Sequence, residues 1–297
     1  MPITVSTIKS FVLAGSIVVG CVASGDAQPR LRAHTATDAA PVSPGSARQF
    51  VRGAQVSMQV RGGTRIITSN GMPGHAIGTF PNRGNPHRVS AQSYRFEMPA
   101  RPTAGQVRDL PRGASFGVAV NGVPFDPNAA EFWQGDPRSG WTYNALGGAV
   151  PLGLDANYAH VQPSGAYHYH GLPVGLMQQL GWSANEASPL IGFAADGFPI
   201  YALTAEVDGK VVRMTSSYRL KPGQRPGGAQ PGGRYDGAFM QDYAFVAGAG
   251  MLDVCNGARI TTAEFRQGTY AYILTDTYPV IPRCLKGAVG RGFAKRR

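Results

Sequence analysis

The sequence is poor in charged residues, in cysteine and in long apolar runs. Only 15% of its 297 residues are charged, with 17 acidic and 28 basic side chains. No segment carries the charged amphipathic pattern of a long helix, which argues against a helical bundle. Glycine and proline are abundant instead, at 40 and 23 residues, and turn-forming residues separate short apolar segments throughout. The composition therefore predicts a mainly β fold, a single sandwich-like domain with long loops.

Several catalytic signatures are also missing. The sequence has no phosphate-binding loop and no dinucleotide fingerprint. Its carboxylates occur singly rather than as the pair that glycoside hydrolysis needs. Whether the protein is an enzyme stays open at this point.

Residues 1–27 are typical of a signal peptide. Lys9 supplies the positive charge, and the apolar run over 11–22 is too short to span a bilayer. Small residues up to Ala27 predict cleavage there, whereas the residues that end at Cys21 resemble a lipobox, in which Cys21 would carry a lipid. Both alternatives predict an exported protein, either periplasmic or secreted, or membrane-anchored as a lipoprotein.

The remaining chain divides by composition into three parts. Residues 28–54 are rich in Pro, Ala and Ser and predict a disordered linker, 55–288 form the β-rich domain, and 289–297 form a basic tail. Much of the net charge of +11 lies in the linker and the tail. This distribution predicts loose association with the envelope or a membrane surface and no binding of nucleic acid. It does not predict the oligomeric state.

The cysteine count becomes informative once export is assumed. Removal or lipidation of Cys21 leaves Cys255 and Cys284. In an oxidising compartment such a pair predicts a disulfide, which here would close a loop of about 30 residues.

Histidine is scarce, yet two of the six histidines lie in Gly-Ala-Tyr-His-Tyr-His-Gly, residues 165–171. His160 precedes His168 by eight residues, with Pro-Ser-Gly at 163–165 between them, and this layout predicts a β-hairpin. A three-residue loop would pair residue 160 with residue 168, and strand alternation would place His168 and His170 on one face. The pattern therefore predicts three imidazoles on one patch, a site for copper or zinc.

Four further residues are candidate ligands, of which His87 is the weakest. His75 lies in a Pro/Gly-rich loop, where a lone histidine has little reason to pack, and His87 is a weaker case. Asp155 lies at the base of the hairpin and Asp196 on an Asp-Gly turn, so either could be a ligand or could orient an imidazole. The alternative is structural: Asp196 forms its turn, and Asp155 binds backbone amides.

A faint internal repeat separates two roles within the hairpin. The Leu-Asp … Gly-x-Tyr-x-Tyr pattern of residues 154–169 recurs over 252–272, but Ala271 and Ile273 stand where the first copy has His168 and His170. The tyrosine face is therefore expected to be structural in both copies. The histidines are expected to carry the function.

Several motifs together resemble the YHYH-domain family. They are Ser-Asn-Gly-Met-Pro-Gly-His at 69–75, Asn-Gly-Val-Pro at 121–124, Tyr-His-Tyr-His at 167–170, Gly-Phe-Ala-Ala-Asp-Gly-Phe-Pro-Ile-Tyr at 192–201, and the block from Cys255 to Cys284. The resemblance covers roughly residues 60–288. It implies a secreted, often lipoprotein-type protein, and it implies no established activity. Many relatives carry cysteines beside this hairpin, where this chain has Asn-Tyr at 157–158 and Val-Gly at 174–175.

The sequence thus favours an exported β-rich protein whose histidine hairpin binds copper or zinc without turnover. One alternative is a metal-dependent hydrolytic or oxidative enzyme that uses the same histidines, with Asp155 or Asp196 as base. Another is a metal-free envelope interaction module. The partner is accordingly expected to be a metal ion or a small ligand.

Overall fold

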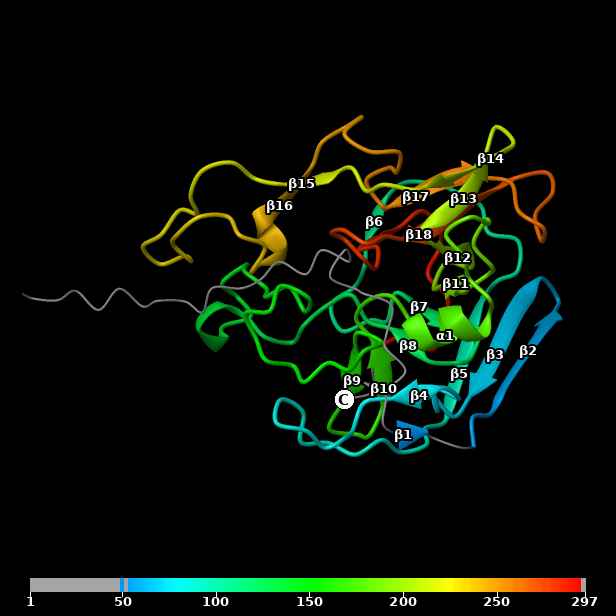
Figure 1. Ribbon diagram of the computed structural model, residues 1–297, viewed down its shortest axis with the longest axis horizontal. Helices are drawn as coiled ribbons and strands as arrows, with labels where there is room; N and C mark the ends of the chain where they lie inside the picture. Colours follow the sequence, from blue (N-terminus) through cyan, green and yellow to red (C-terminus); the bar gives the residue numbers. More distant parts are fainter. Residues whose placement is uncertain (1–48, 51–52, 295–297) are drawn as a thin grey trace, which may run out of the picture. The chain divides into compact units, whose positions relative to one another are not determined.

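The computed structural model describes residues 49–50 and 53–294 (Figure 1). The expected signal peptide, Cys21 and nearly all of the expected linker lie outside the described residues, so they stay predictions. Within the described part the fold is mainly β, as predicted. None of the helices in that part has the length and hydropathy needed to cross a bilayer.

An eight-stranded mixed sheet forms the centre of the fold. In spatial order its strands are β17 (Gly257–Ile260), β18 (Thr269–Leu274), β12 (Pro199–Ala202), β11 (Gly192–Ala194), β7 (Gly117–Ala119), β8 (Pro124–Phe125), β10 (Tyr167–Tyr169) and β9 (Ala159–Val161). Most of these strands are buried on both faces, and the main hydrophobic core packs against them.

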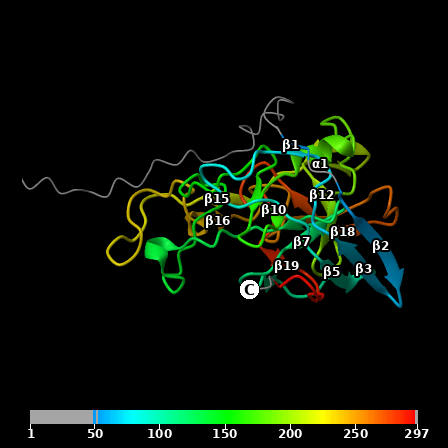
Figure 2. The ribbon, with the colours of Figure 1, turned by 90° about the horizontal axis from the view of Figure 1, so that it is seen from below.

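Smaller elements surround this sheet (Figures 1 and 2). A three-stranded sheet contains β2 (Val56–Arg61), β3 (Thr64–Ser69) and β5 (Tyr94–Pro99). The two-stranded pairs are β1 (Gln49–Phe50) with β4 (Ala76–Ile77), β6 (Arg108–Asp109) with β19 (Cys284–Leu285), β13 (Thr204–Val207) with β14 (Lys210–Arg213), and β15 (Tyr218–Leu220) with β16 (Tyr243–Phe245). Over residues 53–294 the helices are α1 (Val174–Gln179) and two 3-10 turns, η1 (Trp133–Gly135) and η2 (Met240–Asp242).

The large sheet consists of two equivalent halves. We call β7 to β10 the N-terminal half-sheet, and β11, β12, β17 and β18 the C-terminal half-sheet. Each half contains one short hairpin at the middle of the sheet and one hairpin at its edge, and each edge hairpin joins the inner one through a parallel pairing. The halves meet where β7 pairs antiparallel with β11, with Val118 opposite Phe193. Strand order and register together describe an approximate two-fold repeat.

The two inner hairpins show the repeat most clearly. Residues 117–125 read Gly-Val-Ala-Val-Asn-Gly-Val-Pro-Phe, and 192–200 read Gly-Phe-Ala-Ala-Asp-Gly-Phe-Pro-Ile. The turn glycines, Gly122 and Gly197, have φ values of +83° and +90°, a conformation that glycine adopts at low cost. At the join, a Cβ on Gly192 would lie 2.4 Å from the Val118 carbonyl oxygen, so the strands approach too closely for a side chain. The repeat is therefore visible in the sequence at the glycines of the two turns and at the glycine where β7 and β11 meet.

The predicted disulfide between Cys255 and Cys284 is present. It links the turn before β17 to β19, and both cysteines are buried. The bond therefore fixes the edge hairpin of the C-terminal half-sheet to β19.

The first residues of the expected basic tail, 289–294, lie within the described residues. Residues 289–294 are part of the packed structure: the Arg291 amide donates to the Glu97 carbonyl, and Phe293 is 2% exposed. The Phe293 ring lies 5.0 Å from that of Phe96 on β5. Basic residues dominate the composition of residues 289–297, so this composition does not indicate that Phe293 packs against the rest of the fold.

Candidate metal centre

The predicted histidine hairpin forms with the predicted register. β9 and β10 are antiparallel, and His160 is the direct partner of His168. The turn between them places Gly165 at φ +85°, and the Gly165 amide donates to the Gln162 carbonyl. A three-residue loop with glycine in the left-handed position gives this pairing.

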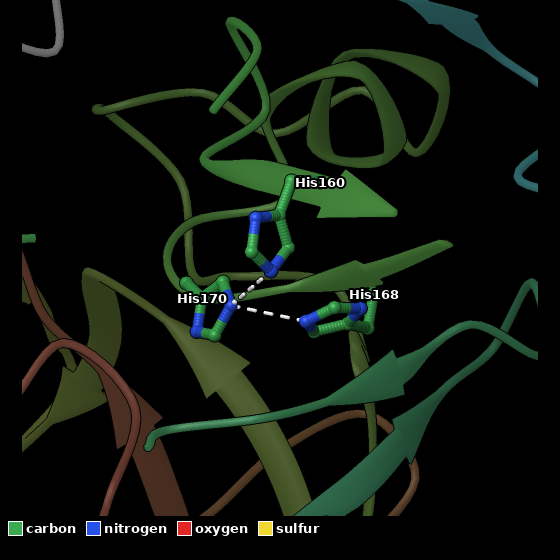
Figure 3. Close-up of side chains that lie close together, drawn as sticks. All are labelled: His160, His168 and His170. Atoms are coloured by element: carbon green, nitrogen blue, oxygen red, sulfur yellow. Dashed lines mark hydrogen bonds between the residues drawn. The ribbon is translucent and has the colours of Figure 1, made fainter. Parts of the chain in front are cut away.

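Three imidazoles converge on the face of this hairpin that carries the histidines (Figure 3). The Nε2 atom of His170 lies 3.0 Å from Nε2 of His168 and 3.1 Å from Nε2 of His160. His168 and His170 are buried and His160 is half-buried. We call these three residues the histidine cluster.

Backbone contacts fix the protonation of two of these rings. Nδ1 of His160 lies 2.8 Å from the Leu152 carbonyl oxygen, and Nδ1 of His168 lies 3.2 Å from that of Ala166. A carbonyl only accepts, so both Nδ1 atoms carry a proton, and in the neutral imidazole each Nε2 atom then presents a lone pair. Backbone acceptors of this kind orient histidines that bind metals.

Two further polar side chains border the cluster. Asp126, which follows β8 and is 1% exposed, places Oδ2 3.9 Å from Nε2 of His168. The amide nitrogen of Gln162 lies 3.4 Å from the same Nε2 atom. Neither residue was predicted as part of the site. A buried carboxylate beside three imidazoles suits a bound cation, because it offsets the positive charge of the ion.

The opposite face of β10 is structural, as expected from the internal repeat. Tyr167 and Tyr169 are fully buried. The Tyr167 hydroxyl donates to Asp155 at 2.7 Å, and the Tyr169 hydroxyl accepts from the Asn121 side-chain amide at 2.9 Å. Burial is the main cause that raises the pKa of both tyrosines, so both hydroxyls stay protonated.

The structure places His75, Asp155 and Asp196 away from the histidine cluster. His75 lies on the tyrosine face, where its Nδ1 donates to the Ala76 carbonyl and its Nε2 accepts from the Tyr169 hydroxyl at 2.6 Å. Burial lowers the pKa of His75, so the neutral form fits these contacts, although the Ala76 contact and Asp155 oppose that shift. The role of His75 in the packing is to accept the hydrogen bond that the buried hydroxyl of Tyr169 donates.

The two aspartates bind backbone amides and tyrosines. Asp155 accepts from the amides of Gly78, Asn157 and Ala159 as well as from Tyr167. Asp196 lies in the C-terminal half-sheet, where Oδ2 accepts from the Tyr272 hydroxyl at 2.6 Å and from two backbone amides. These contacts fit the structural alternative, and neither aspartate is part of the histidine cluster.

A family model described as "YHYH protein" matches residues 95–287. The chain belongs to the YHYH protein family. The match contains both half-sheets and the histidine cluster. No curated protein and no solved structure matches the chain.

Within this YHYH protein, the C-terminal half-sheet supplies an internal comparison for the cluster. The turns before β9 and β17 match: Asp155 and Asp253 each accept from the backbone amides two and four residues further along the chain. Each also accepts from the first tyrosine of the second strand of its hairpin, Tyr167 on β10 or Tyr270 on β18. The register then aligns His160, His168 and His170 with Ala258, Ala271 and Ile273. Gln162 and Asp126 align in the same way with Ile260 and Tyr201.

The aligned positions differ in polarity: the N-terminal half-sheet has histidine, glutamine and aspartate side chains, and the C-terminal half-sheet has mainly apolar ones. Tyr201, Ile260, Ala271 and Ile273 are buried in one hydrophobic cluster, against which Ala258 packs. The fold thus forms this arrangement around an apolar core, and the N-terminal half-sheet replaces that core with polar side chains. The sequence signal that could have identified Asp126 is the repeat of residues 117–126 in 192–201. In that alignment Asp126 is equivalent to Tyr201, so a charged residue takes the place of an aromatic one.

A cavity of about 530 Å³ adjoins the cluster. His168, Asp126 and Gln162 form part of its lining. Other parts come from residues 92–96, from the turn between β9 and β10, from Ser115 and Pro124, and from residues 292–294. The described part of the protein therefore has room for a small molecule beside the histidines.

Proposed function

We propose that this protein binds one Zn²⁺ or Cu²⁺ ion through the Nε2 atoms of His160, His168 and His170, without turnover. The observation that carries the proposal is the convergence of these three nitrogens, two of which present lone pairs. Nε2 of His170 can share a proton with only one of its two neighbours at a time. A cation between the rings satisfies all three.

The spacing supports this assignment. Imidazole nitrogens at about 2.0–2.1 Å from a tetrahedral ion lie about 3.3 Å from one another. The two Nε2 separations of 3.0 and 3.1 Å need only a small outward movement to reach that value. Imidazole donors suit both zinc and copper, and the carboxylate of Asp126 would offset part of the ion's charge.

The internal comparison supports a binding role over a structural one. The C-terminal half-sheet forms the same pair of hairpins with alanine and isoleucine at the histidine positions, so the fold does not need imidazoles there. Buried polar groups without a function lower stability compared with apolar groups of the same volume.

We further propose that the protein acts outside the cytoplasm. The disulfide supports this location, because such bonds persist in oxidising compartments. The N-terminal sequence, with its two alternatives for processing, supports it independently.

Metal content tests the proposal. Untagged protein, stripped with a chelator and dialysed against Zn²⁺ or Cu²⁺, should retain one equivalent by elemental analysis, and the double variant His168→Ala/His170→Ala should retain none. His87→Ala is the matched control, since His87 is half-buried and outside the cluster. Full metal content in the double variant would refute the proposal.

A further inference from the structure

The cavity beside the histidine cluster has a polar end and an aromatic wall. At the polar end lie Asp126 and His168, which are 1% and 3% exposed. The wall contains Tyr94, Phe96 and Phe293, whose rings form a continuous series with centroid separations of 5.3 and 5.0 Å. Burial raises the pKa of Tyr94 to about 12, so this ring stays uncharged.

The volume matches that of a small-molecule site. Ligand pockets typically enclose about 300–1,000 Å³, with mostly apolar walls and a few polar groups that orient the ligand. The cavity, at about 530 Å³, falls in this range. Its wall is assembled from distant parts of the chain, since Phe96 belongs to β5 and Phe293 lies near the end of the described residues.

The C-terminal half-sheet shows what fills the equivalent region when no ligand is needed. There the Tyr201 side chain replaces Asp126, and its hydroxyl lies 2.9 Å from both Thr262 and Glu264. Ile260 replaces Gln162 and packs with Met214 from the loop after β14. The protein's own side chains thus occupy this place in one half, and the other half has a cavity.

We infer that the cavity binds a hydroxylated aromatic compound of one or two rings, with its hydroxyl at Asp126 and His168. This inference rests on the proposed metal site, because the hydroxyl oxygen would face the ion. The class follows from two features of the lining: the aromatic rings favour an aromatic body, and the carboxylate of Asp126 accepts a hydrogen bond from a hydroxyl group. Gln162 offers a second polar contact at the same end.

The test uses the full chain loaded with Zn²⁺, and 2-naphthol as the probe. Isothermal titration should show one binding event, about three- to tenfold tighter than for the saturated analogue decahydro-2-naphthol, because stacking adds to burial. Ser164→Trp places an indole at the exposed rim of the cavity and should weaken binding at least tenfold while zinc content stays within 20% of one equivalent. Ala184→Trp, at an exposed loop position that does not line the cavity, is the matched control.

The outcomes separate this inference from the proposed function. Zinc-loaded protein that does not bind 2-naphthol, that binds the saturated analogue equally well, or that is unaffected by Ser164→Trp would overturn the inference and leave the metal site standing. If no zinc binds, the proposed function fails. The same titration on metal-free protein then tests the cavity alone: binding of 2-naphthol that Ser164→Trp removes would support an aromatic ligand there without the contact to an ion, and no binding would overturn the inference.

Discussion

The buried tyrosine hydroxyls should stabilise the two edge hairpins unequally, and Tyr→Phe variants at equivalent positions measure the difference. Tyr167 is 0% exposed, and its hydroxyl donates to Asp155 at 2.7 Å. Tyr270 is the equivalent residue, but it is only partly buried, and its hydroxyl lies 3.1 Å from each oxygen of Asp253. The side chain of Asp253 is 33% exposed and pairs with Lys286.

The magnitudes follow from these environments. A hydrogen bond to a charged group contributes about 1.5–3 kcal/mol. We expect Tyr167→Phe to lower the free energy of unfolding by about 2 kcal/mol, because Asp155 loses its shortest contact, which comes from a fully buried hydroxyl. Tyr270→Phe should cost about 0.5–1 kcal/mol, since water can replace the hydroxyl at the exposed carboxylate.

Equilibrium unfolding in urea, with the disulfide intact, measures both values. The metal content of both variants should equal that of the unchanged protein, because the tyrosines lie on the face of β10 opposite the histidines. Equal costs for the two variants, or loss of metal from Tyr167→Phe with the fold retained, would refute this assignment of the tyrosines to the fold.

Three further predictions follow from the repeat and the crosslink. The triple variant His160→Ala/His168→Ala/His170→Ile gives the first hairpin the residues of the second; we expect it to stay folded by circular dichroism and to bind no zinc, and unfolding of the variant would contradict the comparison between the half-sheets. Asp196→Asn turns an amide toward the backbone N–H groups of Lys286 and Gly287, so it should lower the free energy of unfolding by about 2–3 kcal/mol in urea; a loss below 0.5 kcal/mol, on the order of a single surface contact, would show that these donors find other acceptors. Removing the disulfide as Cys255→Ala/Cys284→Ala opens a loop with a sequence separation of 29 and should cost about 3 kcal/mol without changing metal content; loss of metal would show that the crosslink also shapes the site.

The sequence predicts the local features of the site well. Strand alternation and the Pro-Ser-Gly turn determine the pairing of His160 with His168, and the second hairpin identifies the tyrosines as structural. Such features depend on residues within about ten positions of one another, where periodicity and turn chemistry act.

Long-range pairing is not encoded in this local way. Asp126 reaches the cluster because β8 pairs in parallel with β10, a contact that neither segment signals by its own pattern. The contacts of His75 and Asp196 are long-range in the same way, because each binds the hydroxyl of a tyrosine distant in the sequence, Tyr169 or Tyr272. A polar residue in a turn looks the same in the sequence whether its partner is a metal or a buried hydroxyl.

Anomalous diffraction at the zinc or copper absorption edge, from crystals of metal-loaded protein, tests the metal site most directly. We expect one peak per chain at the point shared by the Nε2 atoms of His160, His168 and His170, with no peak at His75 or Asp196. A peak at another position, or no peak in crystals grown with excess metal, would contradict the assignment of the histidine cluster as a metal centre.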